Sequence, residues 1–239
     1  MNRLAPLQPL QEAFQGKQFK PTIILLVSPL VLVTWKYFGA PEYYLEELAP
    51  RLALFDTPAA AAVYSFLSAF VLMAVVPALV VKLVFRENLA GYGVRLGERA
   101  RTVRSFLMMA PVLIIAAYVS SRHAEIVAYY PINKSAGTSS SMFGLHACTY
   151  LAFYLGWEFH FRGFLQHGLR DSLGSTNAVL LQVLASVLFH IDRPGVETFA
   201  AIAAGIYWGM LALHTRSLLS GLLQHALLGI ALDWFLCYG

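Results

Sequence analysis

Four ionisable side chains stand out within the apolar stretches of this sequence. Glu158 and Arg162 occur in LGWEFHFRGFLQHGL, residues 155–169, and His190 and His225 lie in two later apolar stretches. On the insertion scale, a charged group at the centre of a membrane helix costs roughly 2.5–3.5 kcal/mol. Residues kept at such a cost are candidates for function.

The types and spacing of these residues suit hydrolysis by an activated water molecule. Glu158 and Arg162 are four residues apart, so they share one helix face, where the cation can keep the carboxylate charged. A carboxylate can act as general base toward water, and imidazoles can orient that water or stabilise an oxyanion. The set predicts amide hydrolysis without a covalent intermediate. A purely structural ion pair is the alternative for Glu158 and Arg162.

Three helices must bring these residues to one depth of a membrane. With the N-terminus inside and a rise of about 1.5 Å per residue, Glu158 lies about 16 Å, His190 about 21 Å and His225 about 12 Å from the inner side. Helix tilt can absorb a spread of about 9 Å. We therefore expect the carboxylate and the two imidazoles to converge near mid-membrane.

Two other chemistries use similar residues. Two histidines and a glutamate match the ligand set of a catalytic zinc ion. The sequence has no H-E-x-x-H, however, and the ligands would come from separate helices, so we expect hydrolysis without a cofactor. A proton-linked transporter could use the same groups as a relay, but the chain has no Gly- or Pro-broken segments in matching halves.

Other polar and aromatic residues are expected to serve in helix packing. A histidine inside a membrane is more often a helix–helix hydrogen-bond donor than a catalyst. GIYWG, residues 205–209, has the small-xxx-small spacing of a tight helix contact, and Trp157 is interpreted as a packing residue. Glu197 and Asp233 have no assigned role. The histidines expected to pack are His146, His160, His167 and His214.

The composition is typical of an integral membrane protein. Of the 239 residues, 58% are hydrophobic and 13% are charged, whereas a soluble domain has about a quarter charged residues. The net charge of +4 includes no basic stripe that would indicate nucleic-acid binding. We expect the partners to be the lipid bilayer and a membrane-embedded or membrane-anchored protein or peptide. The oligomeric state is not indicated.

Apolar segments long enough to approach a membrane span recur along the whole chain. A spanning helix needs roughly 20 mostly apolar residues. We predict an all-α polytopic membrane bundle of about seven transmembrane helices, forming a single domain over residues 1–239. The apolar segments are 22–35, 59–84, 106–119, 143–169, 178–190, 199–213 and 218–235.

The basic residues predict the orientation. If the N-terminus is cytoplasmic, the inside segments hold about eleven Lys and Arg residues, Arg3 among them, and the outside segments about five. The first outside loop also carries acidic residues, including Asp56. The positive-inside rule therefore favours a cytoplasmic N-terminus.

Three stretches in order resemble the motifs of the CPBP family, the CAAX-prenyl-protease-like membrane proteins also called Abi. The family pattern is a glutamate pair followed by Arg-Gly, then an aromatic residue with a histidine, then a histidine on a late helix. The resemblance covers about residues 143–235, which we take as a catalytic core. The stretches are EFHFRGFL (158–165), SVLFHIDRPGVE (186–197) and RSLLSGLLQHALLG (216–229).

The resemblance implies a glutamic-type intramembrane endopeptidase. In the family, the first-motif glutamate activates water, and the two histidines position it and stabilise the oxyanion. The matching residues are Glu158, His190 and His225, with Arg162 supporting the glutamate. A role in bacterial maturation or sorting-signal processing, in the inner membrane, is the implied setting.

Two positions depart from the usual pattern. Trp157 stands where paired members have the first glutamate, and Gly229 stands where the last motif commonly has asparagine. Asp233, one turn later, could supply the missing polar group. Bacterial members with a single glutamate, EFxFRG and H..KP..E resemble this chain, with Arg193 in place of lysine. An inactive membrane scaffold or immunity protein on the same fold is the alternative that these departures favour.

Overall fold

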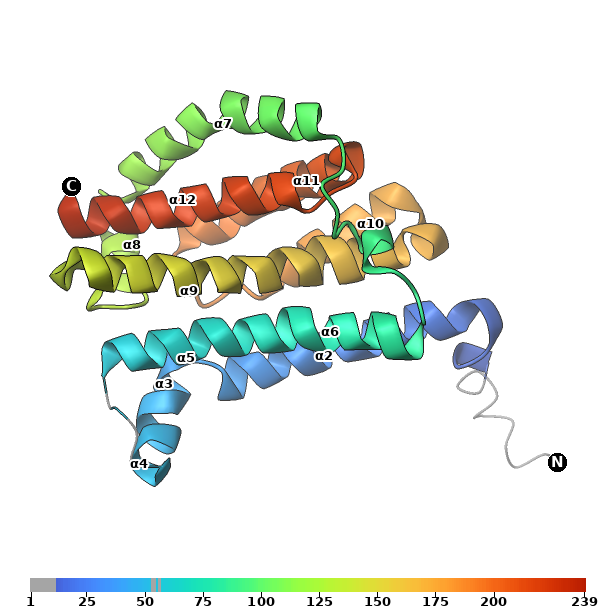
Figure 1. Ribbon diagram of the computed structural model, residues 1–239, viewed down its shortest axis with the longest axis horizontal. Coiled ribbons are helices and arrows are strands. Elements are labelled where there is room, and N and C mark those ends of the chain that lie inside the picture. Colours follow the sequence, from blue (N-terminus) through green and yellow to red (C-terminus); the bar gives the residue numbers. More distant parts are fainter. Residues whose placement is uncertain (1–11, 53–54, 56) are drawn as a thin grey trace.

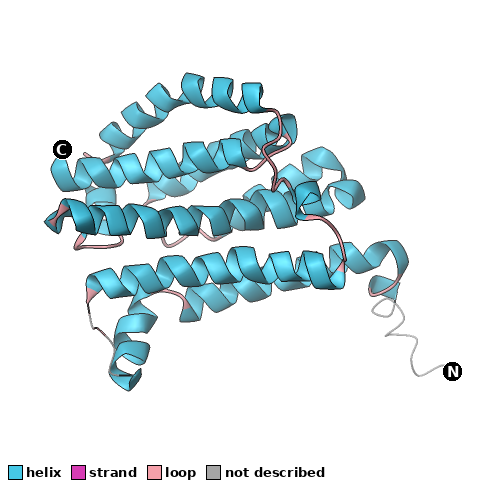
Figure 2. Ribbon diagram, in the orientation of Figure 1, coloured by secondary structure: helices cyan, strands magenta, loops and turns pink. Residues whose placement is uncertain are grey.

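The computed structural model describes residues 12–52, 55 and 57–239, and all regular structure in this part of the chain is helical (Figure 2). The predicted all-α fold is therefore confirmed. Arg3 and Asp56, which entered the charge comparison, lie outside the described residues.

The first half of the chain forms three long apolar rods. The second rod is continuous over Pro58–Val84 and contains several wide turns. Its start is fixed by Thr57, whose hydroxyl accepts a hydrogen bond from the Ala60 amide, a common helix cap. The elements are η2 (Gly16–Gln18), α2 (Phe19–Phe38), α3 (Pro41–Tyr43), η3 (Tyr44–Leu48), α4 (Ala49–Leu52), α5 (Pro58–Phe70), η4 (Val71–Val75), α6 (Val76–Leu79), η5 (Val80–Val84), η6 (Leu89–Tyr92) and α7 (Arg99–Ser120).

The second half carries the three motifs. The first motif begins at the end of α9 and continues through a π-helical segment, η8, a widened helix that is frequent at functional sites. Gly174 (φ 77°, ψ 160°) interrupts α10 and reverses the chain, so only the part of α10 after it is the helix predicted over 178–190. The elements are α8 (Ala124–Tyr129), η7 (Ala136–Thr138), α9 (Ser140–Glu158), η8 (Phe159–His167), α10 (Gly168–Leu188), α11 (Gly195–Thr215) and α12 (Leu219–Tyr238).

In the part of the chain that the structure describes, five helices are long and apolar enough to cross a membrane, judged by length and composition alone. Two of the predicted spans, 143–169 and 178–190, fall on helices outside this group, although both segments are helical. The first of them carries the charged pair, and the second is shortened by the break in α10. The five helices are Gly16–Phe38, Pro58–Val84, Arg99–Ser120, Gly195–Thr215 and Leu219–Tyr238.

Helix α9 lies in the middle of the bundle, between α5 on one side and α12 on the other, and α7 covers α12 (Figure 1). At Gly156 an added Cβ would lie 3.0 Å from the backbone of Ala69 and Phe70, so α9 and the α5 rod pack closely. Close backbone approach at small residues is the usual source of helix association where lipid removes the hydrophobic driving force. The motif-one helix is therefore held firmly from both sides.

The GIYWG segment of α11 packs as predicted. Gln166 of η8 donates a hydrogen bond to the Gly209 carbonyl at 2.8 Å, and Gln182 of α10 donates one to the Gly205 carbonyl at 2.9 Å. Both amides are fully buried. The two glycines thus admit polar side chains that hold α11 against η8 and α10.

Candidate active site

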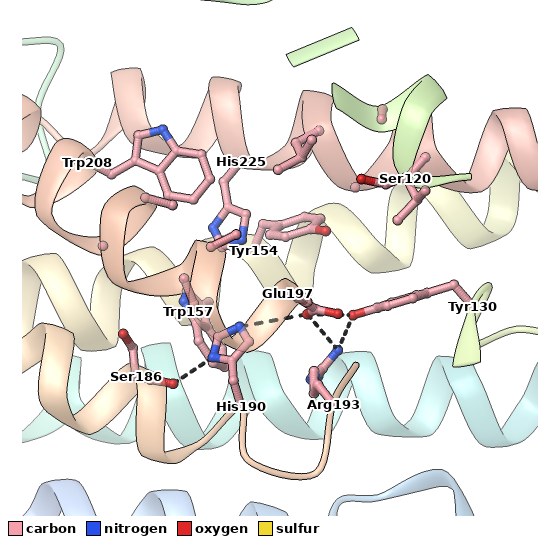
Figure 3. Close-up of a pocket in the computed structure, with 18 of the residues that line it drawn as sticks. Ser120, Tyr130, Tyr154, Trp157, Ser186, His190, Arg193, Glu197, Trp208 and His225 are labelled. Atoms are coloured by element: carbon pink, nitrogen blue, oxygen red, sulfur yellow. Dashed lines mark hydrogen bonds and ion pairs between the residues drawn. The ribbon is translucent and has the colours of Figure 1, made fainter. Parts of the chain in front are cut away.

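The three motifs surround one cavity of about 180 Å³ (Figure 3). His190, His225 and Arg162 line it, so three of the four predicted site residues reach the same space. Glu158 does not line it but lines a neighbouring cavity instead, and its carboxylate contacts His225. The predicted set is therefore brought together, with the carboxylate in an outer position.

Glu158 and His225 form the first carboxylate–imidazole pair, which we call the buried pair. His225 Nδ1 and Glu158 Oε1 are 2.8 Å apart, and the glutamate is only 1% exposed. Gly221 of α12 permits this approach, since a Cβ there would lie 2.9 Å from Glu158 Oε2. The His225 ring is stacked on Trp208, with centroids 4.4 Å apart, and Tyr154 lies 4.6 Å away. Its orientation is thus fixed by its neighbours.

Arg162 compensates the charge of the buried pair. Its Nη1 lies 3.2 Å from Glu158 Oε1, and both side chains are 2% exposed. The guanidinium carbon lies 5.8 Å from the centre of the Trp208 ring, within cation–π range. Arg162 Nε and Nη1 have no hydrogen-bond partner among the described residues. The predicted ion pair is present, and donor capacity is left at the edge of the cavity.

His190 and Glu197 form the second carboxylate–imidazole pair, which we call the open pair. His190 lies in the turn after α10, and its Nδ1 is 2.6 Å from the Ser186 carbonyl oxygen. A nitrogen facing a carbonyl must carry the proton, so Nε2 has a free lone pair when the ring is neutral. Nε2 lies 3.8 Å from Glu197 Oε1, which is too far for a direct hydrogen bond.

Glu197 is held in place by residues from two other segments. The Tyr130 hydroxyl, just after α8, donates a hydrogen bond to Glu197 Oε1 at 2.8 Å. Arg193 donates to that hydroxyl and lies 3.7 Å from the same carboxylate oxygen. All three side chains line the cavity. Neither Glu197 nor Tyr130 was predicted as a site residue, although Glu197 is the last residue of the second motif.

Trp157 fills the space between the two histidines. Its ring centroid is 5.2 Å from that of His190 and 6.4 Å from that of His225, both in edge-to-face geometry. It is 2% exposed and stacks on Phe153, so the prediction of a packing role is confirmed. An indole therefore occupies the position of the first glutamate in the family pattern.

The second departure, Gly229, has a steric explanation. A Cβ at this position would overlap the Tyr154 hydroxyl, so the phenol takes the space where a longer side chain would begin. Asp233 does not compensate, contrary to our suggestion. It is fully buried, its Oδ2 lies 2.7 Å from His146 Nε2, and it is not among the residues that line the cavity. His146 thus makes the predicted helix–helix contact.

The other histidines do not behave as predicted. His160 is fully buried, yet neither ring nitrogen has a hydrogen-bond partner among the described residues. It packs against Phe161 and Phe164, whose rings leave it only apolar neighbours on those sides. His167 is likewise without a partner in the described part of the chain, and His214 is exposed. The expected helix–helix hydrogen bonds are therefore wrong for these residues.

The zinc alternative finds no matching ligand cluster in the described ranges. No three His, Cys, Asp or Glu side chains there are grouped so that they could hold a metal ion. The reason is geometric, since the buried pair and the open pair lie on different sides of the cavity, with Trp157 between their histidines.

Comparison with known proteins finds one family model that matches the segment with the three motifs. Residues 136–231 match the family model described as Rce1-like, type II CAAX prenyl endopeptidase. The match is less than half of the chain, but it runs from η7 into α12 and includes all three motifs. No curated protein and no solved structure matches the chain. The match supports the assignment of this segment to the CPBP family.

Proposed function

We propose that this chain is an intramembrane endopeptidase that hydrolyses a peptide bond of a membrane-associated protein or peptide with an activated water. One observation carries the proposal: the histidines of the second and third motifs, His190 and His225, line the same cavity. The match to a CAAX-type endopeptidase family supports the reaction class.

The two sides of the cavity suit different parts of the reaction. When His225 is protonated, Glu158 balances its charge, and the Nε2–H is then free to donate toward the cavity. Together with Arg162 this gives a side able to stabilise the oxyanion of a tetrahedral intermediate. The His190 side offers a lone pair to water. Because Glu158 does not line the cavity, we propose that it acts on the substrate through His225.

The setting of the reaction is part of the proposal. Large apolar side chains on the outside of α7, such as Leu107 (65% exposed) and Met108 (68%), fit contact with lipid rather than water. We propose a bacterial inner-membrane protein with a cytoplasmic N-terminus that matures a precursor or processes a sorting signal. Residues 143–235 are proposed as its catalytic core.

A reporter assay in membranes tests the function. The chain is co-expressed with a panel of single-span reporter proteins tagged on both sides of the membrane, and cleavage is followed by gel and by mass spectrometry of the fragments. We expect Glu158→Gln, His190→Ala and His225→Ala each to abolish cleavage while the variants still insert. Glu158→Gln is the sharpest of these, because glutamine keeps the shape and loses the charge. Cleavage by this variant at the wild-type rate would contradict the proposal.

An inactive scaffold is the second candidate, and the buried Trp157 is the observation that favours it. This candidate predicts that no reporter is cut and that Glu158→Gln and His225→Ala keep the cellular phenotype of the wild type. Loss of a phenotype on Glu158→Gln alone would exclude it.

A further inference from the structure

One acidic side chain lines the cavity among the described residues, and it is Glu197 rather than the first-motif glutamate. Water activation needs a base that the water can reach, so the position of a carboxylate decides which one can serve. Glu158 is 1% exposed, and its Oε1 is already engaged by His225 and Arg162. The Glu197 side chain is 23% exposed and faces the open space.

One water can bridge Glu197 and His190. A separation of 3.8 Å excludes a direct hydrogen bond, but a water that lies beside the line joining the two atoms can be about 2.8 Å from each of them. His190 Nε2 can accept a hydrogen bond from this water, because Nδ1 donates to Ser186. Glu197 Oε1 can accept the other, since an oxygen that binds the Tyr130 hydroxyl still has a second lone pair.

A structural role alone does not explain the placement of Glu197. A glutamate in the first turn of a helix, paired with Arg193, often serves only to stabilise the helix start. Here Glu125 already binds that end, because its Oε2 accepts a hydrogen bond from the Gly195 amide at 3.1 Å. Glu197 instead points into the cavity, and its buried Oε2 has no hydrogen-bond partner in the described ranges.

We infer that Glu197 is the catalytic carboxylate that binds the attacking water together with His190 and takes its proton, an assignment that rests on the proposed endopeptidase function. In this assignment Glu197 of the second motif takes the role of the first-motif glutamate, whose position is occupied here by Trp157. Glu158 is a positioning residue that acts through His225. Tyr130 and Arg193 are positioning residues for Glu197.

The reaction balances with these groups. An O–H bond of the water breaks and its proton passes to Glu197, while the oxygen forms a bond to the carbonyl carbon of the scissile peptide. The electron pair of the C=O bond moves to the oxygen, on the side of His225 and Arg162. When this pair returns, the C–N bond breaks, and protonated Glu197 gives its proton to the leaving amine. The carboxylate is restored for the next cycle.

The reporter assay tests this assignment with a matched control. We expect Glu197→Gln to lower the cleavage rate by on the order of 10²–10⁴-fold, the usual contribution of a general base. The control is Glu125→Gln. Glu125 contacts the first residue of α11, Gly195, but does not line the cavity, so this variant should cleave at the wild-type rate. Thermal unfolding of each variant in detergent checks that the protein is folded.

Chemical rescue covers the case in which glutamine disturbs the fold. Glu197→Ala opens room beside His190, and added formate, a small carboxylate, should restore part of the cleavage. Formate should not rescue Glu158→Ala, because the role of Glu158 is to position the His225 ring.

Three results separate this inference from the function on which it rests. Wild-type cleavage by Glu197→Gln, or no rescue of Glu197→Ala by formate, overturns the assignment of Glu197. If Glu158→Gln is inactive in the same series, the endopeptidase function stands. If the wild-type chain cuts no reporter, both fail.

Discussion

The buried pair and the open pair differ in the distance between carboxylate and imidazole and in the exposure of their side chains. In the buried pair the atoms are 2.8 Å apart and the Glu158 side chain is 2% exposed. In the open pair they are 3.8 Å apart, with side chains 23% and 12% exposed. The two pairs thus use the same two chemical groups, once in direct contact and once with a gap.

The difference in distance suits the two carboxylates to different roles, because one can orient a histidine and the other can bind a water. A carboxylate in direct contact with an imidazole fixes its orientation and charge, but leaves no position for a water between them. A carboxylate at a longer distance, braced by Tyr130, leaves that position free. Burial of the Glu158 carboxylate also costs free energy, because a charge removed from water must be compensated. Arg162 supplies the compensating charge. The comparison therefore predicts that the buried pair matters more for stability than the open pair.

Removal of each arginine gives the largest expected difference. Arg162→Ala leaves the buried Glu158 without its cation, and loss of one partner of a buried ion pair costs about 3–5 kcal/mol. Arg193→Ala leaves Glu197 its hydrogen bond from Tyr130, so we expect only about 1–3 kcal/mol. Unfolding in detergent with a denaturant measures both. Equal losses would mean that the two sides of the cavity are not distinct.

The His146–Asp233 pair provides an intermediate case. Its atoms are 2.7 Å apart and both side chains are fully buried, so it resembles the buried pair but does not line the cavity. Asp233→Asn removes the charge that the histidine meets, and we expect a loss of about 1–3 kcal/mol of stability. Reporter cleavage per folded molecule should stay at the wild-type rate. A selective loss of cleavage would place Asp233 in the reaction after all.

The contacts that could be predicted were those that follow from spacing along the sequence. The i to i+4 relation places Arg162 beside Glu158, and the depths of three apolar segments correctly brought His225 to the same place. What sequence could not give was which side of His225 the carboxylate occupies. That depends on the packing at Gly221, where the absence of a side chain lets Glu158 reach α12.

The contribution of the second motif was harder to predict for a similar reason. Glu197 meets His190 only because the turn after α10 folds back, and Tyr130 comes from a segment 67 residues earlier. Contacts between residues so far apart in the sequence depend on tertiary packing, so the periodicity of the sequence does not predict them. The apolar patterns predicted the all-helical fold and a break between the segments 143–169 and 178–190. They did not predict that helix would continue on both sides of Gly174, the residue that interrupts α10.

A partly exposed carboxylate, Glu87, gives the smallest expected effect. Glu87 follows the second rod, and its Oε2 accepts hydrogen bonds from Lys20 at 2.7 Å and from Tyr92 at 2.6 Å. Partial burial acts to raise the Glu87 pKa, but the bonds from Lys20 and Tyr92 and the charge of Lys20 outweigh it, so the pKa lies below its ordinary 4.5. The ionised form is therefore favoured by folding.

The sign of the pH dependence follows. A carboxyl whose pKa is lowered by folding stabilises the protein above its unfolded pKa, and this contribution is lost as the pH falls through the lower folded pKa. The two side chains are 31% and 40% exposed, so solvent screens the pair, and we expect only about 0.2–1 kcal/mol. Unfolding measured from pH 6 to pH 3, in wild type and in Glu87→Gln, tests this. The difference between the two should shrink toward the acid end, and a difference independent of pH would show that the Lys20 contact stabilises by packing rather than by charge.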